Sequence, residues 1–472
     1  MASKNNPAPA FTRREALRGA AAAVAGFTIV PSYVLGGARG TAPNEKPSIA
    51  GIGLGSVGYI HIRQCAKAGF QVTALCDVDD DYAKRSFDLF PEARRYRDFR
   101  ELFAAEGDKI DAVYCGTPDH THATVTMAAL KRKKHVCCVK PLTRTLHESR
   151  TVVRAARQAG VATLMTAAPN TDELGCRTCE LIWAGAIGAV REVHTWSDRP
   201  QWPQAMMRPP GEDPVPSTLD WKLWIGPAPM RPFKATWPED HLAVQQVPSD
   251  GPRRGVYHPW NFRGWWDFGT GALGDMGSHH FNTPIRALKL GHPVSVHASS
   301  TKLFEETAPR ASIVTLDFPA RADLPPVRVV WYDGGVKPPC PKEWEGPLAH
   351  EGTLYLGDEG KLLVRRPPSC KTDEVHVLPA SRAKKFEKVP RTLHRSTSKW
   401  SDWFEACRGG EPAACNFDVA GPMTDLLHLG NIAIRTGKPL DWDAKAGRVT
   451  NLEEADRYIN PPYHNGWSLE AT

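Results

Sequence analysis

The chain has 472 residues, enough for two domains with cores of their own, and a formal net charge of +7. The first 40 residues carry +4 of this charge, so the remainder carries +3, which excludes the strongly basic surface typical of nucleic-acid binding. The 11 cysteines do not suggest a disulfide framework, and Cys176–Cys179 is a lone CxxC with no second pair at zinc spacing.

The N-terminus resembles an export signal. Arg13 and Arg14 precede an apolar run from Gly19 to Val30, about 12 residues, which is too short to span a bilayer. Over residues 1–40 this pattern predicts a twin-arginine signal, hence export in the folded state by the twin-arginine machinery to the periplasm or cell envelope. The alternative is an amphipathic N-terminal helix of a cytosolic protein. Ala38 is a candidate cleavage point, but no A-x-A motif precedes it, so the leader could remain as an anchor.

A dinucleotide site is predicted directly after this region. A buried strand, Ser48–Ile52, is followed by a glycine-rich turn and a helix that runs to Ala68. A second strand, Gln71–Cys76, ends at Asp77, where a carboxylate binds the ribose hydroxyls and disfavours a 2′-phosphate. NAD is therefore favoured over NADP. The turn is GxGxxG, and its predicted cofactor residues are Gly53, Gly55, Ser56, Val57 and Gly58.

Strands continue to alternate with helices, which predicts a Rossmann-type, doubly wound parallel sheet over residues 47–168. The further strands are Ile110–Cys115 and His135–Val139. The expected helices are 79–90, 98–105 and 121–132. Ligands bind at the carboxyl ends of such strands, and the loops 116–122 and 139–142 occupy that edge.

The pattern changes after about Met165. A helix over 173–185 precedes several strands with fewer helices between them, which predicts an α+β domain with a large, mostly antiparallel open sheet over 169–445. The predicted strands are 190–197, 294–303, 311–318, 327–332 and 352–357. The tail, 446–472, returns to polar and aromatic residues and is expected to cross a neighbouring subunit.

Four motifs resemble the glucose–fructose oxidoreductase / inositol dehydrogenase / rhizopine-catabolism (Gfo/Idh/MocA) family. They are GLGSVG (53–58), CGTPDHTH (115–122), HVCCVKPL (135–142) and GDMGSHH (274–280). The phrase NFDVAGPMTDLLHLGNIAIRTGKPLDWDA (416–444) further resembles a secreted, twin-arginine branch of that family.

The resemblance implies specific roles. Lys140, Asp275 and His279 match the residues that face the nicotinamide and carry out catalysis. The loop residues implied to lie along the cofactor are Thr117, Pro118, His122, Lys140 and Pro141. Two departures stand out. Val139 replaces the glutamate that usually precedes the lysine, and the stretch 165–175 replaces a glycine–asparagine–glutamine stretch that commonly approaches substrate and nicotinamide.

The chemistry of these residues fits oxidation of a secondary alcohol. Burial and a nearby cation lower the pKa of a lysine, which would suit Lys140 to act as a base, and Val139 leaves it a dry neighbour. Asp275 and His279 are four residues apart and would project from one face of a helix, where His279 could relay the proton. The alternatives are a helix cap at Asp275 with a buried histidine, or a metal site of Asp275, His279 and His280. Because no further ligand is evident nearby, no metal is predicted.

Eight of the 15 tryptophans lie between Trp196 and Trp266. Tryptophan faces suit sugar rings, but for most of these residues packing of a long insert is the favoured interpretation. The predicted substrate residues are Trp260, Arg263, Trp265, Trp266 and His280, because they lie near Asp275 in the sequence.

The leading hypothesis is an NAD-dependent oxidoreductase for a sugar, polyol or sugar derivative, with a tightly bound cofactor. One alternative is an NAD-dependent redox-assisted glycosidase or lyase, and another is a non-catalytic sugar-binding protein on a dehydrogenase scaffold. The expected partners are a small carbohydrate and further copies of the chain, in a dimer or tetramer formed through the C-terminal sheet.

Overall fold

The computed structural model describes residues 46–167, 170–246, 255–365 and 374–470. Residues from Pro47 onward form one compact unit. The predicted twin-arginine leader therefore lies outside the described residues. Among the described helices, none has the length and apolar character needed to cross a membrane.

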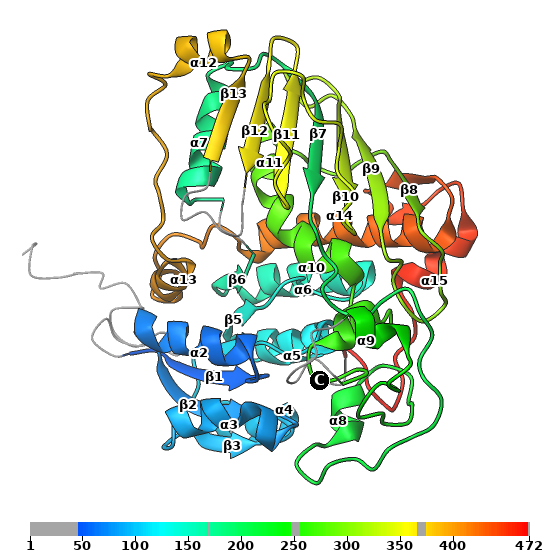
Figure 1. The fold of residues 1–472 in the computed structure, drawn as a ribbon. Coiled ribbons are helices and arrows are strands. Elements are labelled where there is room, and N and C mark those ends of the chain that lie inside the picture. The colour runs from blue at the N-terminus through cyan, green and yellow to red at the C-terminus, as the bar shows by residue number, and fades with distance from the viewer. Residues whose placement is uncertain (1–45, 168–169, 247–254, 366–373, 471–472) are drawn as a thin grey trace, which may run out of the picture. The chain divides into compact units, whose positions relative to one another are not determined.

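The first sheet is parallel, with strand order β3-β2-β1-β4-β5-β6 (Figure 1). This is the order of a doubly wound dinucleotide-binding sheet, so the predicted Rossmann-type fold is confirmed. The central strands are almost wholly buried, as expected when helices cover both faces. The strands are β1 (Ser48–Ile52), β2 (Gln71–Cys76), β3 (Arg94–Tyr96), β4 (Ala112–Cys115), β5 (His135–Cys138) and β6 (Thr163–Met165).

The helices of this sheet start where the sequence offers side-chain caps. Asp79 caps α3, Asp98 caps α4, and Thr145 forms a capping box with Glu148 at the start of α6. The N-termini of α2 and α5 are different, because no side chain caps either of them. The helices are α2 (Val57–Ala68), α3 (Asp80–Leu89), α4 (Phe99–Glu106), α5 (Asp119–Lys131) and α6 (Leu146–Ala159).

The second sheet has nine strands in the order β13-β12-β11-β7-β10-β9-β8-β14-β15. Its pairs are antiparallel except for β7 and β10, which confirms the predicted α+β domain with a mostly antiparallel sheet. The strands are β7 (Val190–Trp196), β8 (Ser295–Ser300), β9 (Ser312–Phe318), β10 (Val327–Tyr332), β11 (Gly352–Gly357), β12 (Lys361–Arg365), β13 (Glu374–Leu378), β14 (Leu440–Asp443) and β15 (Arg448–Val449).

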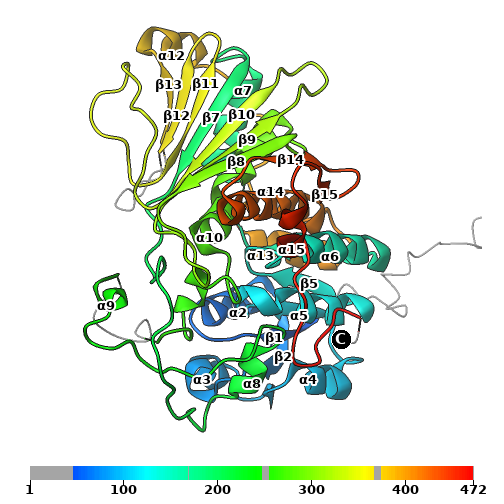
Figure 2. The same cartoon turned by 90° about the vertical axis from the view of Figure 1, so that its right-hand side faces the viewer.

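Helices cover one face of this sheet and connect it to the first. The long helix α14 packs on β8 and β9 and also on α6 of the first sheet (Figure 2). Helix α10 lies against α14, while α7 lies against α11, β12 and β13. The bounds are α7 (Glu173–Trp183), α10 (Gly271–His280), α11 (Asn282–Leu288) and α14 (Phe417–Thr436).

The long insert between β7 and α10 has a core of its own, built largely from aromatic side chains. All its tryptophans except Trp260 are buried, as the packing interpretation predicts. The insert contains α8 (Trp221–Ile225), α9 (Leu242–Gln246) and the short 3-10 helix η2 (Asn261–Gly264). The remaining elements are α12 (Ala380–Phe386), α13 (Lys399–Cys407), η3 (Glu453–Ala455) and α15 (Asp456–Ile459).

The tail after α15 runs back past α5 to the neighbourhood of α4 (Figure 2). Lys131 in α5 donates to the carbonyl oxygens of Leu469 and Glu470, and the ring of Trp467 packs on Phe99 in α4. Up to residue 470 the tail therefore packs on the Rossmann domain of its own chain, and a crossing to a neighbouring subunit stays a prediction.

Candidate active site

A cavity of about 540 Å³ lies at the carboxyl ends of the parallel strands. Its walls come from the loops after β1, β2, β4 and β5, from α10, and from the insert. A doubly wound sheet binds ligands at this edge because several helix N-termini and loops meet there. Of the predicted cofactor residues, those lining the cavity are Gly53, Gly55, Ser56, Val57, Asp77, Thr117, Pro118 and Lys140.

The glycine-rich turn has the shape that a pyrophosphate requires. Gly53 has a φ of 81°, and a Cβ there would lie 2.5 Å from the backbone N of Thr117. A Cβ on Gly58 would lie 2.2 Å from the carbonyl oxygen of Gly53, so Gly58 packs helix on strand and lies outside the cavity wall. Because the α2 N-terminus has no side-chain cap, its first N–H groups can bind an anion.

Asp77 has the placement expected of a ribose-binding carboxylate. Its oxygens accept hydrogen bonds from the backbone N–H groups of Leu54 (2.6 Å) and Asp79 (3.0 Å). Burial raises the pKa of Asp77, and these two N–H donors oppose that rise. Each carboxylate oxygen has a second lone pair, which could accept a ribose hydroxyl. The residues present therefore fit a dinucleotide.

His122 and Pro141 were expected along the cofactor, but neither lines the cavity. The imidazole of His122 is fully buried, with Nε2 2.8 Å from the carbonyl oxygen of Thr117 and Nδ1 2.8 Å from that of Pro141. Both acceptors are carbonyl oxygens, so both bonds form together only when each ring nitrogen carries a hydrogen. His122 thus connects the loop after β4 to the loop after β5. It helps to position Thr117 and Lys140, which line the cavity in these two loops.

Lys140 and Asp275 meet in the cavity, although they are 135 residues apart. The ammonium of Lys140 lies 2.6 Å from Asp275 Oδ1 and donates to the carbonyl oxygen of Asp275 at 2.8 Å. Arg263 Nε donates to the same Oδ1 at 2.9 Å. One carboxylate oxygen therefore holds two cations, a lysine from the sheet edge and an arginine from the insert.

The charges of this cluster shift both pKa values. Burial lowers the pKa of Lys140, and the charge of Asp275 only partly opposes this. Burial raises the pKa of Asp275, but Lys140 and Arg263 outweigh it and hold the pKa well below its usual range. The cluster thus pairs a fully ionised carboxylate with a lysine that loses its proton more readily than an ordinary one.

His279 lies one helical turn after Asp275 on α10 and lines the same cavity. Burial, reinforced by Lys140, lowers its pKa well below the usual value, so the imidazole is neutral near pH 7. A neutral imidazole can accept a proton at one nitrogen and donate from the other. The predicted convergence of Lys140, Asp275 and His279 is what the structure shows.

The predicted substrate residues divide into two groups. Trp260 and Arg263 line the cavity. Trp265, Trp266 and His280 do not. Trp265 donates through Nε1 to the carbonyl oxygen of Val256 inside the core of the insert.

Trp266 and His280 are likewise buried and contact groups outside the cavity lining. Trp266 packs beneath Arg435, and His280 contacts Trp331 and lies 3.8 Å from Glu351. Successive residues of a helix point about 100° apart, and here His279 lines the cavity while His280 packs on Trp331. The proposed substrate roles of Trp265, Trp266 and His280 were therefore wrong as direct contacts. Among the described residues, no cluster of His, Cys, Asp and Glu is arranged to hold a metal ion.

Several residues that line the cavity were missed by the sequence analysis. Tyr82 of α3 lies against Gly55, where a Cβ would approach its ring to 2.0 Å. Others include Arg199, Gln201, Trp202, Trp224, His258, Lys399 and Trp467. They come from segments far away in the sequence, and no local motif marks them.

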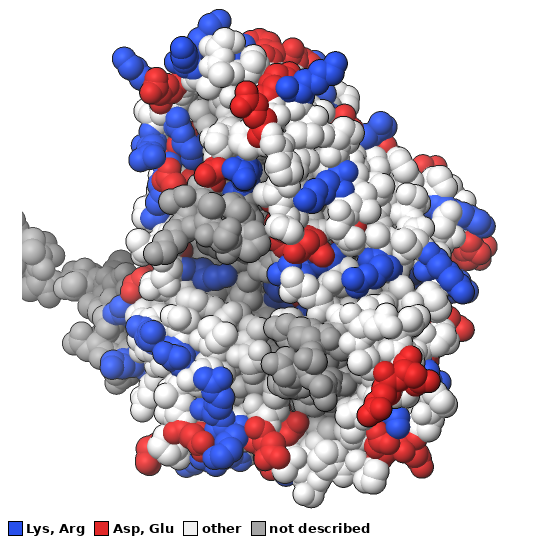
Figure 3. Space-filling view, viewed as in Figure 1, with Lys and Arg blue, Asp and Glu red and all other residues white. Residues whose placement is uncertain are grey.

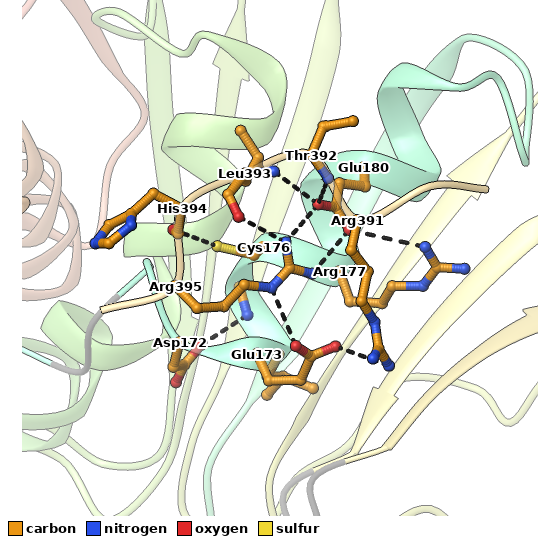
Figure 4. A network of polar contacts seen from close by, with 12 residues as sticks. Asp172, Glu173, Cys176, Arg177, Glu180, Arg391, Thr392, Leu393, His394 and Arg395 are labelled. Carbon is orange, nitrogen blue, oxygen red and sulfur yellow. Dashed lines mark hydrogen bonds and ion pairs between the residues drawn. The ribbon is translucent and has the colours of Figure 1, made fainter. Parts of the chain in front are cut away.

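A network of polar contacts joins α7 to the segment that precedes α13, the helix that begins at Lys399 (Figure 4). Glu180 of α7 accepts hydrogen bonds from the backbone N–H groups of Thr392 and Leu393 and from the guanidinium of Arg395. These contacts fix the segment that leads into α13. The ammonium of Lys399 donates to the carbonyl oxygen of Ala167 at 2.8 Å, and burial lowers its pKa.

The two departures from the family pattern can now be placed. Val139 is 8% exposed and lines the cavity beside Lys140. Within 165–175, residues 168–169 lie outside the described part of the chain, Thr166 lines the cavity, and Asn170 donates to Asn282 instead.

On the face shown in Figure 3, basic and acidic side chains are intermixed and form no surface of a single sign.

Residues 48–167 match the family model GFO_IDH_MocA, described as "Oxidoreductase family, NAD-binding Rossmann fold". An inositol 2-dehydrogenase of Salmonella paratyphi B is 30% identical over 148 residues, which are 30% of this chain and 43% of that protein. The chain thus matches less than half of this curated relative. Residues 48–167 are therefore similar to the NAD-binding Rossmann domain of the predicted family.

Solved structures extend the likeness to both sheets. The WlbA dehydrogenase from Bordetella pertussis, in complex with NADH and UDP-GlcNAcA, has a TM-score of 0.58 at 16% identity and covers 84% of this chain and 99% of its own. An aldose–aldose oxidoreductase from Caulobacter crescentus, complexed with glycerol, has a TM-score of 0.56 at 17% identity and covers 84% and 100%. At these identities the likeness shows a shared fold.

Proposed function

We propose that the chain is a member of the Gfo/Idh/MocA family of NAD-binding oxidoreductases, which residues 48–167 resemble, and that it oxidises or reduces a CH–OH group of a sugar, polyol or sugar derivative with NAD as cofactor. The observation that carries the proposal is the meeting of Lys140, Asp275 and His279 in the cavity that also contains the glycine-rich turn and Asp77. NAD, when bound, supplies the hydride acceptor.

The chain's own residues supply the proton chemistry. Lys140, whose pKa burial lowers, takes the proton of the substrate hydroxyl. Asp275 keeps the ammonium in place and stabilises the charge that it gains. Neutral His279 accepts a proton within the same cavity and relays it, while Arg263 holds the carboxylate of Asp275 from the insert side. Trp260 offers an aromatic wall for the apolar face of a sugar ring.

Tight retention of the cofactor is supported first by the insert. The backbone N–H of Asp80 donates to Thr218, and that of Asp220 donates to Val78, so the insert is joined to the end of β2. His258 of the insert lies 2.9 Å from Asp79. These contacts place the insert beside Asp77, over the part of the cavity that would hold the adenosine.

Contacts of the C-terminal tail also support tight retention of the cofactor. Asn465 donates to the carbonyl oxygens of Gly226 at 2.9 Å and Ala228 at 2.8 Å, at the end of α8. Trp467 lines the cavity and packs on Phe99, with ring centroids 5.8 Å apart. Insert and tail thus close the cavity from two sides, and release of a bound dinucleotide would require both to move.

Retention would make sense of the predicted leader. Because the twin-arginine route exports folded proteins, a dinucleotide bound before export would travel inside the protein and be regenerated in place. We propose the periplasm or cell envelope as the location on this ground, and a homo-oligomer formed through the nine-stranded sheet.

A second candidate is a redox-assisted glycosidase or lyase. In this scheme, oxidation at one sugar carbon acidifies the neighbouring C–H, elimination expels the leaving group, water adds, and the hydride returns to the sugar. The enclosure by insert and tail favours it, because a retained cofactor ends each cycle in its starting state. The non-catalytic alternative rests on Val139 and on stretch 165–175, but Lys140, Asp275 and His279 still converge.

The test is to denature the purified full chain and identify released nucleotide by absorbance and mass. If no NAD or NADH is released and added NAD does not bind, both enzymatic proposals fail. If NAD is present, the protein is incubated with a panel of sugars, polyols and glycosides. NADH formation, or paired oxidised and reduced sugars, identifies the oxidoreductase, and cleavage without net NADH identifies the glycosidase. A Lys140→Met variant should keep the nucleotide and lose turnover by about 10²–10⁴-fold.

A further inference from the structure

A second, smaller cavity of about 30 Å³ lies beside the start of α10, the helix that carries Asp275 and His279. It is separate from the cofactor cavity and has no lining residue in common with it. The side chains that define it are Arg144, Trp266, Thr270, Arg435 and Tyr458. Its volume would hold one or two water molecules or one monatomic ion.

The cavity contains two guanidinium groups and no carboxylate. Among the described residues, no ion pair involves Arg144 or Arg435, and neither aspartate nor glutamate lines the cavity. Arg435 contacts two aromatic rings, Tyr458 at 4.0 Å and Trp266 at 5.1 Å from its Cζ to each ring centroid. Asp267 is close enough to influence Arg435 but forms its ion pair with Arg231.

The hydrogen-bonding capacity of these guanidiniums is largely unused. Arg144 makes one side-chain hydrogen bond, from Nη1 to the carbonyl oxygen of Trp266, and its buried Nε has no partner. For Arg435, no hydrogen bond is found within the described part of the chain. Burial lowers the pKa of Arg435 to about 10, and the charge of Arg144 adds to this effect. Two partly buried cations that have no ion-pair partner among the described residues are costly, and an anion between them would offset that cost.

The start of α10 adds to the positive character of the cavity. Gly269 and Thr270, the last residues before α10, line it. No side chain caps this helix, because the hydroxyl of Thr270 donates to Asp119 instead. A helix N-terminus carries a partial positive charge and favours an anion.

We propose that this cavity binds one small inorganic anion of the size of chloride, held between Arg144 and Arg435 at the N-terminus of α10. The anion joins three parts of the chain: the loop after β5, helix α14, and the C-terminal tail with Tyr458. By offsetting one of the two positive charges behind α10 and lying between both guanidiniums, it stabilises the helix that positions Asp275 and His279.

The first test is thermal unfolding of the full chain in increasing sodium chloride, compared with sodium methanesulfonate at equal ionic strength. Chloride should raise the unfolding midpoint saturably, by roughly 1–3 °C, because a ligand that binds only the folded state stabilises it. Arg435→Met should abolish the difference between the two salts. The matched control, Arg154→Met, removes an exposed arginine of α6 and should keep the difference.

The second test needs no variant, so it decides the matter even if Arg435→Met fails to fold. Crystals soaked in sodium bromide should show an anomalous peak between Arg144 and Arg435. Equal midpoints in the two salts at every concentration, or a cavity that holds only water after the bromide soak, would overturn the proposal. Activity is not needed for either measurement, so the outcome is independent of the proposed oxidoreductase function.

Discussion

Replacement of Asp275 by asparagine tests whether the Lys140–Asp275 pair sets the protonation of the catalytic base. In the native protein, burial lowers the pKa of Lys140 and the charge of Asp275, 2.6 Å from the ammonium, opposes that effect. Asparagine keeps the size of the side chain but removes the charge. The pKa of Lys140 should then fall further, by about 1–3 units, the usual effect of one nearby opposite charge.

The consequence for activity follows from the form of lysine that reacts. A base must be neutral, so the rate of alcohol oxidation rises with pH through the pKa of Lys140 and then levels off. In Asp275→Asn this rise should move to lower pH by the same 1–3 units, equal to about 1–4 kcal/mol of lost interaction with the ammonium. The plateau should fall, because Arg263 and Lys140 lose the group that holds both of them.

The measurement is kcat/KM against pH with whichever sugar the panel identifies, or the pH dependence of reduction of bound NAD in a single turnover. Asp418→Asn is the matched control, because Asp418 forms an exposed ion pair with Arg157 and does not line the cavity. Its profile should match that of the native protein. A rise in Asp275→Asn at the native pH, or at higher pH, would refute the assignment of Lys140 as the base.

Three further predictions concern cofactor and stability. Trp467→Ala should speed dissociation of NAD by roughly 5–150-fold, the range given by 1–3 kcal/mol for an aromatic contact with a base. The control Trp183→Ala replaces an exposed tryptophan of α7 and should leave the dissociation rate unchanged. Equal dissociation rates for Trp467→Ala and the native protein would show that the tail does not retain the cofactor. Glu180→Gln should lower the free energy of unfolding by about 3 kcal/mol near pH 7. Arg395 lowers the pKa of Glu180 to about 2, so this stabilisation is complete above the unfolded-state pKa of about 4.3 and is lost as pH falls towards 2. The free energies of unfolding of the native protein and Glu180→Gln, measured in urea, should therefore converge near pH 2. A constant difference at all pH values would show that ionisation of Glu180 does not contribute to stability. Asp77→Ser should raise the affinity for NADP relative to NAD by at least about tenfold, since repulsion between one buried carboxylate and a phosphate exceeds about 1.4 kcal/mol. Calorimetric titration of nucleotide-free protein with each dinucleotide measures this ratio of affinities.

Much of the fold was predictable because its signals are local. The strand at 48–52, the turn at 53–58 and the helix at 57–68 occur where hydrophobic periodicity and glycine spacing place them. Short elements were missed for the opposite reason. β3 and β6 have three residues each, too few to show a period, and their strand conformation depends on pairing with neighbours.

The site was predictable to the extent that its residues share motifs. Lys140, Asp275 and His279 were found in two short phrases, and the helical spacing of the last two gave their common face. Arg263 and Trp260 were chosen for nearness in sequence to Asp275, and the same criterion wrongly selected Trp265 and Trp266. Nearness along the chain does not determine direction, and both of these rings were taken up by cores of the fold.

The contribution of Val139 can now be argued from charge. The family's glutamate would place a carboxylate beside Lys140, and its absence, together with the change at 165–175, motivated the non-catalytic alternative. In this chain, however, Lys140 already has a carboxylate partner in Asp275, supplied by α10, and Arg263 shares it. A glutamate at 139 would have to be buried, since Val139 is 8% exposed, and would raise the pKa of the lysine beside it. Valine instead leaves Lys140 with a single ionised partner and a lower pKa, so the substitution is compatible with a lysine that acts as the base.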